Sequence, residues 1–98
     1  MEASLTHEAF THQAGTKFQV QVEGNRGVEL ELTEISELKR NPRQEEFAIL
    51  FRGPLDAFLG QGIRLFTHNE LGQFEMFIVP IRQDEQGFYY EAVFNRIS

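Results

Sequence analysis

Apolar and polar residues alternate along much of the chain with the period of two that is typical of β-strands. The alternation is clearest in residues 16–22 and 27–36, which are separated by a glycine-containing hairpin loop. In the second run the apolar positions change phase, because Leu32 is even-numbered and Ile35 is odd-numbered. This change predicts a β-bulge near residues 33–34. The side expected to face the core consists of Phe18, Val20, Val22, Val28, Leu30 and Leu32.

Two further runs are apolar on both sides. Residues 47–51 read Phe-Ala-Ile-Leu-Phe, and residues 72–82 place apolar side chains at even and odd positions alike. A strand of this kind is covered on both faces, within a closed or layered sheet or by a helix or a partner chain. Pro80 has no N–H for a ladder hydrogen bond, so we expect it at a bulge, at an edge or beyond the end of the neighbouring strand. The second run has Phe74, Met76 and Ile78 on one side and Phe77, Val79 and Ile81 on the other.

The remaining segments are assigned from shorter patterns. Residues 63–68 and 88–95 are predicted strands, because they alternate and are bounded by turn residues. Residues 39–43 are interpreted as a basic loop. Residues 55–62 have apolar residues at helix-like spacing and are interpreted as a single helical turn over one end of the sheet.

Residues 4–14 have the pattern of a short helix. Ser4 or Thr6 is a suitable N-cap, and Gly15 is a suitable end. Because a helix of this length is not stable alone, we expect it to dock on the sheet. The residues that share its apolar face are Leu5, Ala9 and Phe10.

Together these elements predict a mainly β fold. About six antiparallel strands would form a small barrel or sandwich, with the short N-terminal helix packed on it. The 98 residues fit one domain, with a helical segment over residues 1–15 and a β-sheet core over residues 16–98. Ten phenylalanines, two tyrosines and no tryptophan suit a β core filled with flat side chains.

The amino-acid composition disfavours several classes of binding partner and several kinds of site. Nine basic and fifteen acidic residues give a net charge of −6, which disfavours nucleic acids and anionic membranes. The absence of cysteine excludes disulfides, thiol chemistry and cysteine zinc sites. The N-terminus has no signal-peptide pattern, and no apolar run has the length of a membrane span. We expect cytoplasmic synthesis, with the protein remaining there or joining an exported or extracellular assembly.

The polar residues predict no catalytic, cofactor-binding or metal site. His7 and His12 are five positions apart rather than four, and His68 is distant in the sequence. Glu29 and Glu31 share one side of a strand, but the alternation around them predicts that they face solvent. No glycine-rich phosphate loop or serine-nucleophile motif is present. We therefore expect a protein that is not an enzyme and needs no cofactor.

Five stretches are informative together: residues 30–38, 47–54, 68–72, 77–80 and 90–95. The most specific phrases in them are Phe-Arg-Gly-Pro and Tyr-Glu-Ala-Val-Phe-Asn. Through these stretches nearly the whole chain resembles a family of small bacterial domains with no assigned function, whose members often lie beside phage-tail-collar-like or tail-fibre-like proteins. The resemblance implies a stand-alone domain that assembles with a larger fibrous or tail-like protein, and it brings no catalytic residues.

The two-faced strands leave more apolar surface than one short helix covers. We expect a structural or interaction domain that assembles with itself or with a larger tail-like or fibre-like protein through sheet edges and an apolar face. If a partner covers that face, Glu91 needs a cation, which Arg52, Arg64 or Arg82 could supply. If the barrel closes fully, the same apolar residues are internal instead. The predicted interaction residues are Phe77, Val79, Ile81, Tyr89, Glu91, Val93 and Arg52.

Other functions have weaker support. An acidic immunity or inhibitor protein that binds a basic toxin or nuclease is the main alternative, and it predicts fast association that weakens steeply with salt. Binding of single-stranded nucleic acid through the basic residues at 39–43 is disfavoured by the surrounding acids. An enzyme or small-ligand barrel has the least support. The acids that motivate the inhibitor hypothesis are Glu23, Glu29, Glu31, Glu34 and Glu37.

Overall fold

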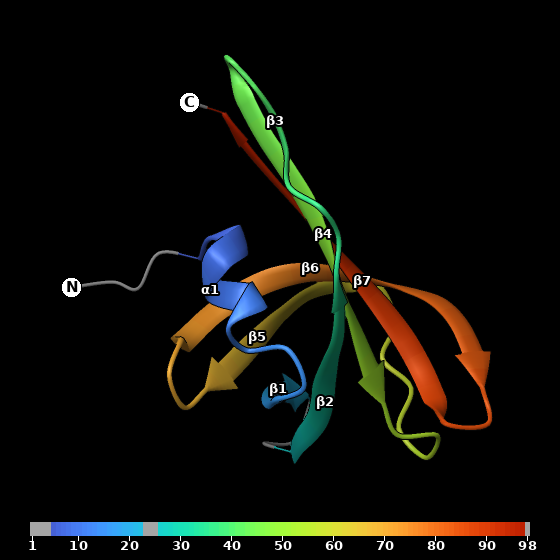
Figure 1. Cartoon of the computed structure of the whole chain (residues 1–98). Coiled ribbons are helices and arrows are strands. Elements are labelled where there is room, and N and C mark those ends of the chain that lie inside the picture. Colours follow the sequence, from blue (N-terminus) through green and yellow to red (C-terminus); the bar gives the residue numbers. More distant parts are fainter. Residues whose placement is uncertain (1–4, 23–25, 98) are drawn as a thin grey trace.

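In the computed structural model the chain forms one antiparallel sheet that closes into a barrel (Figure 1). The structure describes residues 5–22 and 26–97, with the backbone alone at residues 96 and 97. The elements in this part of the chain are α1 (His7–Thr11), β1 (Lys17–Val22), β2 (Arg26–Ile35), β3 (Lys39–Asn41), β4 (Gln44–Gly53), β5 (Gly62–His68), β6 (Gly72–Asp84) and β7 (Gly87–Ile97).

Six of the strands form the wall of the barrel. They are neighbours in the order β2-β1-β5-β6-β7-β4, and β4 pairs with β2 to close the ring. Every pairing is antiparallel. The predicted mainly β fold with about six antiparallel strands is confirmed, and the barrel is the form it takes. Closure leaves no open edge within the ring itself.

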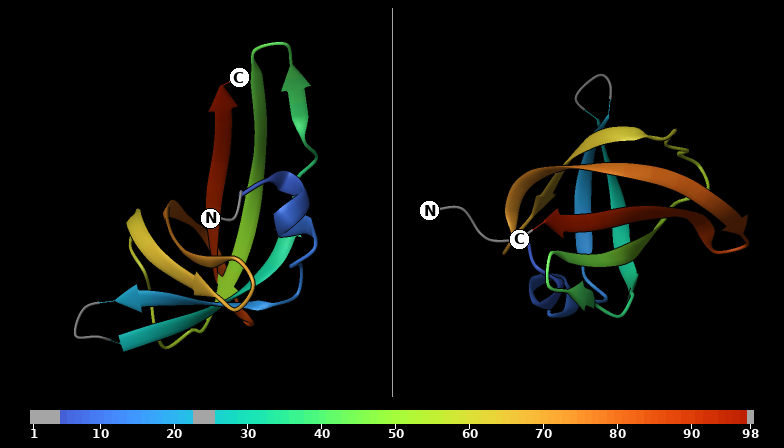
Figure 2. Two further views of the ribbon diagram at one scale, coloured as in Figure 1. Left: turned by 90° about the vertical axis from the view of Figure 1, so that its left-hand side faces the viewer. Right: turned by 90° about the horizontal axis from the view of Figure 1, so that it is seen from above.

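β4 and β7 are longer than the wall and continue beyond it, as the left view of Figure 2 shows. β3 pairs with β4 on this extension. We call β3, residues 44–48 of β4 and residues 92–97 of β7 the arm. The prediction of a loop over residues 39–43 was wrong for residues 39–41, because the extended β4 offers them a strand to pair with.

Two irregularities interrupt the barrel wall: the predicted bulge in β2, and a bulge at Pro80, which is one of the three positions expected for this proline. The pairing of β2 with β4 shifts between Leu32 and Glu34, where the change of phase predicted a bulge. The pairing of β6 with β7 shifts between Pro80 and Arg82, so Pro80 lies at a bulge. The first shift turns Ile35 back toward the core, against which it is partly buried.

Phenylalanine rings fill the interior. Phe18, Phe51 and Phe66 are fully buried, and the ring centroid of Phe51 lies 5.2 Å from those of both Phe18 and Phe66. Offset and edge contacts between flat rings stabilise such a cluster beyond the area that it buries. The strand alternation therefore predicted the inward positions of the wall correctly.

The N-terminal helix is shorter than predicted and covers His7–Thr11 only. Thr6 is its N-cap, through a hydrogen bond from the Ala9 N–H at 3.0 Å, whereas Ser4 lies outside the described residues. Phe10 is the one buried residue of α1. Its ring contacts Phe18, Phe47, Phe74 and Phe94. A single turn anchored by one ring thus takes the place of the predicted docked helix over residues 4–14.

The connection between β4 and β5 lies at the lower end of the barrel in Figure 1. The predicted helical turn over residues 55–62 does not form there. Instead Leu59 is buried, and its N–H donates to the Tyr90 hydroxyl at 2.9 Å. Nearby, Gly87 has φ +158°, and a Cβ there would overlap the Gly53 carbonyl oxygen. The tight turn into β7 therefore needs glycine at position 87.

Candidate protein-interaction site

Large apolar side chains lie on the outer surface of β5, β6 and β7. Ile63 is 68% exposed, and it lies opposite Phe77, which is 51% exposed. Val93 is 56% exposed and Ile81 is 46% exposed. These positions are odd-numbered and so face away from the inward-facing core residues of the same strands. We call Ile63, Phe77, Val79, Ile81 and Val93 the outer patch; Val79 is half-buried.

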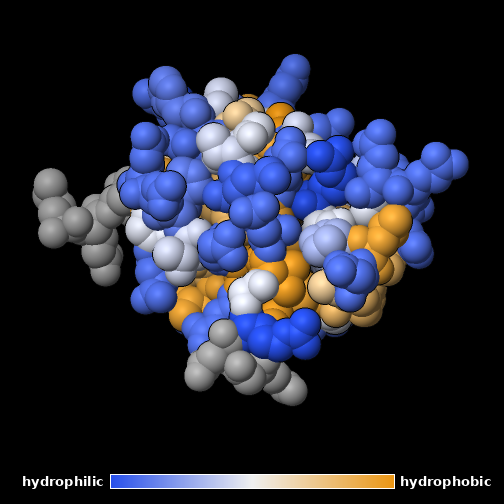
Figure 3. Space-filling model, turned by 90° about the horizontal axis from the view of Figure 1, so that it is seen from below, coloured by the Kyte–Doolittle hydropathy of each residue, from blue (hydrophilic) through white to orange (hydrophobic). Residues whose placement is uncertain are grey.

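The lower end of the barrel exposes further apolar residues. Leu55 and Phe58 lie in the connection between β4 and β5, and both are exposed. The Phe58 ring packs edge-on against Phe88, with 5.1 Å between the ring centroids. Seen from below, apolar side chains gather near the middle and at the right of the molecule, among hydrophilic ones (Figure 3). An irregular connection thus leaves in solvent the side chains that a helical turn was expected to bury.

The arginines near the outer patch have partners other than the predicted one. Arg52 donates to Glu31 at 2.9 Å, because these two residues lie opposite each other in β4 and β2. Arg82 lies over the Tyr89 ring, with its Cζ 4.2 Å from the ring centroid. This cation–π contact covers Tyr89, which is buried rather than available to a partner.

Glu91 consequently has no counter-ion among the described residues, and Arg52 and Arg82 do not form an ion pair with it in the single chain. Arg64 does not supply the charge either, since it donates to the Gly60 carbonyl oxygen at 2.8 Å. Glu91 is half-buried on β7, opposite Val79 on one side and Leu50 on the other. A half-buried carboxylate between apolar neighbours is suited to a cation from outside the chain.

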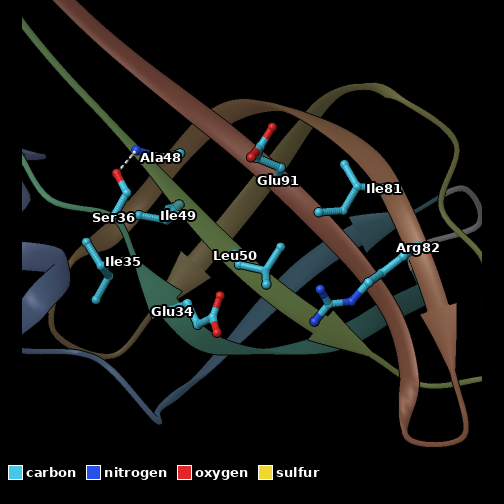
Figure 4. A pocket seen from close by; sticks show the side chains of 9 residues that line it. All are labelled: Glu34, Ile35, Ser36, Ala48, Ile49, Leu50, Ile81, Arg82 and Glu91. Atoms are coloured by element: carbon cyan, nitrogen blue, oxygen red, sulfur yellow. Dashed lines mark hydrogen bonds between the residues drawn. The ribbon is translucent and has the colours of Figure 1, made fainter.

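An open groove of about 520 Å³ crosses β2, β4, β7 and β6 beside the outer patch. Figure 4 shows Leu50 between the Glu34 carboxylate and the Arg82 guanidinium, with Glu91 and Ile81 above them in the view. Glu34, like Glu91, has no ion pair among the described residues. The groove therefore combines an apolar floor with two carboxylates that lack a counter-ion.

The outer surface of β1 and β2 is polar instead. Lys17 lies 3.3 Å from the Glu29 carboxylate, and the Gln19 amide donates to the same carboxylate at 3.1 Å. Glu31 is bound by Arg52, as described above. Two of the acids that motivate the inhibitor hypothesis are therefore already paired within the chain, and Glu23 lies outside the described residues.

The structure contains a polar network around His68 that was not predicted from the sequence. His68 is 7% exposed, and its Nδ1 accepts the N–H groups of Glu70 at 3.0 Å and Leu71 at 3.2 Å. The ring proton is then on Nε2, which donates to the Thr16 hydroxyl at 3.0 Å, and this hydroxyl donates to the Gln13 carbonyl at 2.7 Å. Both ring nitrogens therefore form hydrogen bonds within the chain, one to the backbone of residues 70–71 and one to Thr16. No sequence motif marks this network, because 52 positions separate Thr16 from His68.

The surroundings of two other titratable side chains, Tyr90 and Asp84, shift their pKa values. Burial raises the pKa of the Tyr90 hydroxyl, although the Leu59 N–H opposes this shift. The Gln86 N–H donates to the Asp84 carboxylate and lowers the pKa of Asp84.

Within the described residues, no three His, Asp or Glu side chains are grouped so as to hold a metal ion. No helix in that part of the chain has the length and apolar character of a membrane span.

Comparison with known protein families identifies the family of this barrel. A model described as a domain of unknown function, DUF6916, matches residues 5–94. The chain belongs to this family. The expected membership of a family without assigned function is confirmed to this extent, and the match spans every strand of the DUF6916 barrel up to the last residues of β7. Neither the curated proteins nor the solved structures contain a match.

Proposed function

We propose that this DUF6916 domain is a non-enzymatic structural or interaction domain that assembles with a copy of itself or with a larger tail-like or fibre-like protein. The observation that carries the proposal is the outer patch. Ile63, Phe77, Ile81 and Val93 stay exposed although the barrel is closed and its core is filled. Exposed apolar side chains on neighbouring strands are typical of sites where another protein docks.

The surroundings of the outer patch suit a protein partner. The groove beside it is open rather than enclosed, with Leu50 as an apolar floor and Glu34 and Glu91 as unpaired carboxylates. Apolar centres with polar groups at their border are the usual anatomy of protein interfaces. The tail-like or fibre-like character of the partner rests on the resemblance of the sequence to domains found beside such proteins.

A pair of double variants tests this proposal. Ile63→Ser with Phe77→Ser removes the centre of the outer patch, whereas Gln19→Ser with Gln21→Ser changes two exposed residues on the polar side of the barrel. Native mass spectrometry and light scattering would follow the full chain alone and mixed with any tail-like or fibre-like protein that is encoded beside it. We expect assembly by the wild type and the glutamine variant, and association at least about tenfold weaker for the patch variant.

Two results would contradict the proposal. One is a wild-type chain that stays a monodisperse monomer under all these conditions. The other is a patch variant that is folded, as judged by circular dichroism, and assembles as well as the wild type.

A further inference from the structure

One edge of β7 is open on the arm. β6 pairs with β7 from Asp84 opposite Gly87 to Val79 opposite Glu91, and no described strand pairs with this side of β7 beyond Glu91. The other side of β7 is occupied by β4 as far as Ile97. Figure 1 and the left view of Figure 2 show β6 curving away while β7 continues beside β4. The arm therefore ends in a free strand edge.

The hydrogen bonds of Ala48 show which backbone groups face this edge. The Ala48 N–H donates to the Ser36 Oγ at 2.8 Å, and the Ala48 C=O accepts the Ser36 N–H at 2.8 Å, so both groups point away from β7. Val93 lies opposite Ala48, and its own N–H and C=O must then point away from β4. Asn95, two positions on, has the same orientation. Val93 and Asn95 thus offer two donors and two acceptors to an added strand.

The opposite edge of the arm is protected against such addition. It is formed by β3, which has only three residues, all exposed, and two of them are Lys39 and Arg40. Short strands with basic side chains are a common protection of sheet edges. The corresponding stretch of β7 is Asn95, Arg96 and Ile97, and the open edge, which begins at Val93, is longer than β3 and has one basic residue where β3 has two.

Side-chain sites flank the open edge on both faces. On the inner face a cavity of about 310 Å³ lies between the start of α1 and the arm, with Leu5, Phe47 and Phe94 in its lining. On the outer face are the exposed Val93 and the unpaired Glu91. Successive residues of an added strand point to the two faces in turn. An apolar residue would therefore enter the cavity, and its neighbour would lie opposite Val93 on the outer face, diagonal to Glu91, which itself lies opposite Val79 of β6.

We propose that the open edge of β7, residues 93–97, receives an extended strand of a partner protein in which apolar and basic residues alternate. Main-chain hydrogen bonds supply affinity in such strand addition, and side-chain pockets supply specificity. Charge selects this occupant over a second copy, because each copy carries a net charge of −6, whereas a basic strand is attracted to Glu91. The inference rests on the proposed function and specifies the partner's chemistry.

Proline substitution tests the proposal without disturbing the arm. Val93→Pro removes an N–H that faces the open edge and no hydrogen bond to β4, so the arm still folds. Arg40→Pro is the matched control on the edge of β3, where Arg40 lies opposite Glu45. Circular dichroism and thermal unfolding check that both variants fold. The probes are short labelled peptides, one alternating lysine with isoleucine and one alternating glutamate with isoleucine.

We expect fluorescence anisotropy to show binding of the lysine peptide to the wild type and to Arg40→Pro, and binding at least about tenfold weaker to Val93→Pro. The glutamate peptide should bind at least about tenfold more weakly than the lysine peptide. Amide hydrogen exchange of Val93 and Asn95 should slow when the lysine peptide is bound, because these N–H groups become donors to it.

Several outcomes would overturn the proposal: no binding of the lysine peptide, equal binding to Val93→Pro, or equal binding of the glutamate peptide. Slow exchange of Val93 that depends on protein concentration without peptide would assign the edge to a second copy. If the outer-patch variant loses assembly but Val93→Pro keeps it, strand addition is wrong and the interaction function stands. If both keep it, the proposed function fails as well.

Discussion

The two halves of the barrel wall enclose the same phenylalanine core but differ on the outside. On β1 and β2 the outward positions hold Lys17, Gln19 and Glu29, whose side chains bind one another. On β5, β6 and β7 they hold the outer patch, which no described element covers. Glu91 in this half lacks the counter-ion that Glu29 has in the other. The polar side chains of one half have partners within the chain, whereas the apolar side chains of the other half stay exposed.

Inward-facing and outward-facing apolar side chains contribute differently to the stability of the barrel. Inward residues of both halves leave water on folding and stabilise the barrel. Outward apolar residues stay largely in water, so their contribution to the folding of a single chain is small. Their presence on one half only is therefore not explained by the stability of the single chain, and it supports the proposed assembly.

The largest effect is expected from a comparison of Phe66 with Ile63 on the same strand. Phe66→Ala empties the core and should lower the free energy of unfolding by about 3–5 kcal/mol. Ile63→Ala should change it by no more than about 0.5 kcal/mol, because Ile63 is 68% exposed. Urea unfolding of both variants measures these changes. A loss above about 2 kcal/mol in Ile63→Ala would assign the outer patch to folding instead.

The two tyrosines of β7 give a second comparison, since Tyr90 faces the core and Tyr89 faces outward beneath Arg82. Tyr90→Phe leaves the buried Leu59 N–H without its acceptor and should cost about 1–3 kcal/mol. Tyr89→Phe keeps the ring under Arg82 and should cost less. Guanidinium unfolding at neutral pH measures both.

The pH dependence of stability sharpens this comparison. The folded state raises the pKa of Tyr90 above its ordinary value of 10.0, so the unfolded chain loses this proton first. Stability from the neutral hydroxyl is then fully present below pH 10 and is lost as the pH rises through the folded pKa. We expect the stability difference between wild type and Tyr90→Phe to shrink above pH 10. A constant difference across this range would contradict the assignment.

The smallest effect is expected in the polar half. Glu31→Gln removes the ion pair with Arg52, which is about 2.9 Å long and lies partly in solvent, and should cost no more than about 1 kcal/mol. Because salt screens such a pair, the loss should decrease between low and high ionic strength. Thermal unfolding at two salt concentrations tests this, with Gln21→Ser as a control that should not respond to salt.

Local patterns in the sequence predicted several features of the strands correctly. Alternation predicted the inward residues of the strands, and a single change of phase after Leu32 predicted the bulge in β2. Pro80 predicted a second irregularity through its missing N–H. The predictions failed where they needed a partner distant in the chain. β3 pairs with β4 although no pattern in residues 39–41 indicates a strand, and Arg52 binds Glu31 rather than Glu91 because strand register brings the first two together.

The sequence by itself determined which residues point to the same side of each strand, because the side-chain period of two is a property of neighbouring residues. Only the tertiary structure decided which side is covered. The pairing of β2 with β4 closes the ring and places one apolar face of β6 inside, while the other face keeps Phe77 and Ile81 in solvent. Ring closure depends on hydrogen bonds between strands far apart in the chain, and local alternation carries no information about them.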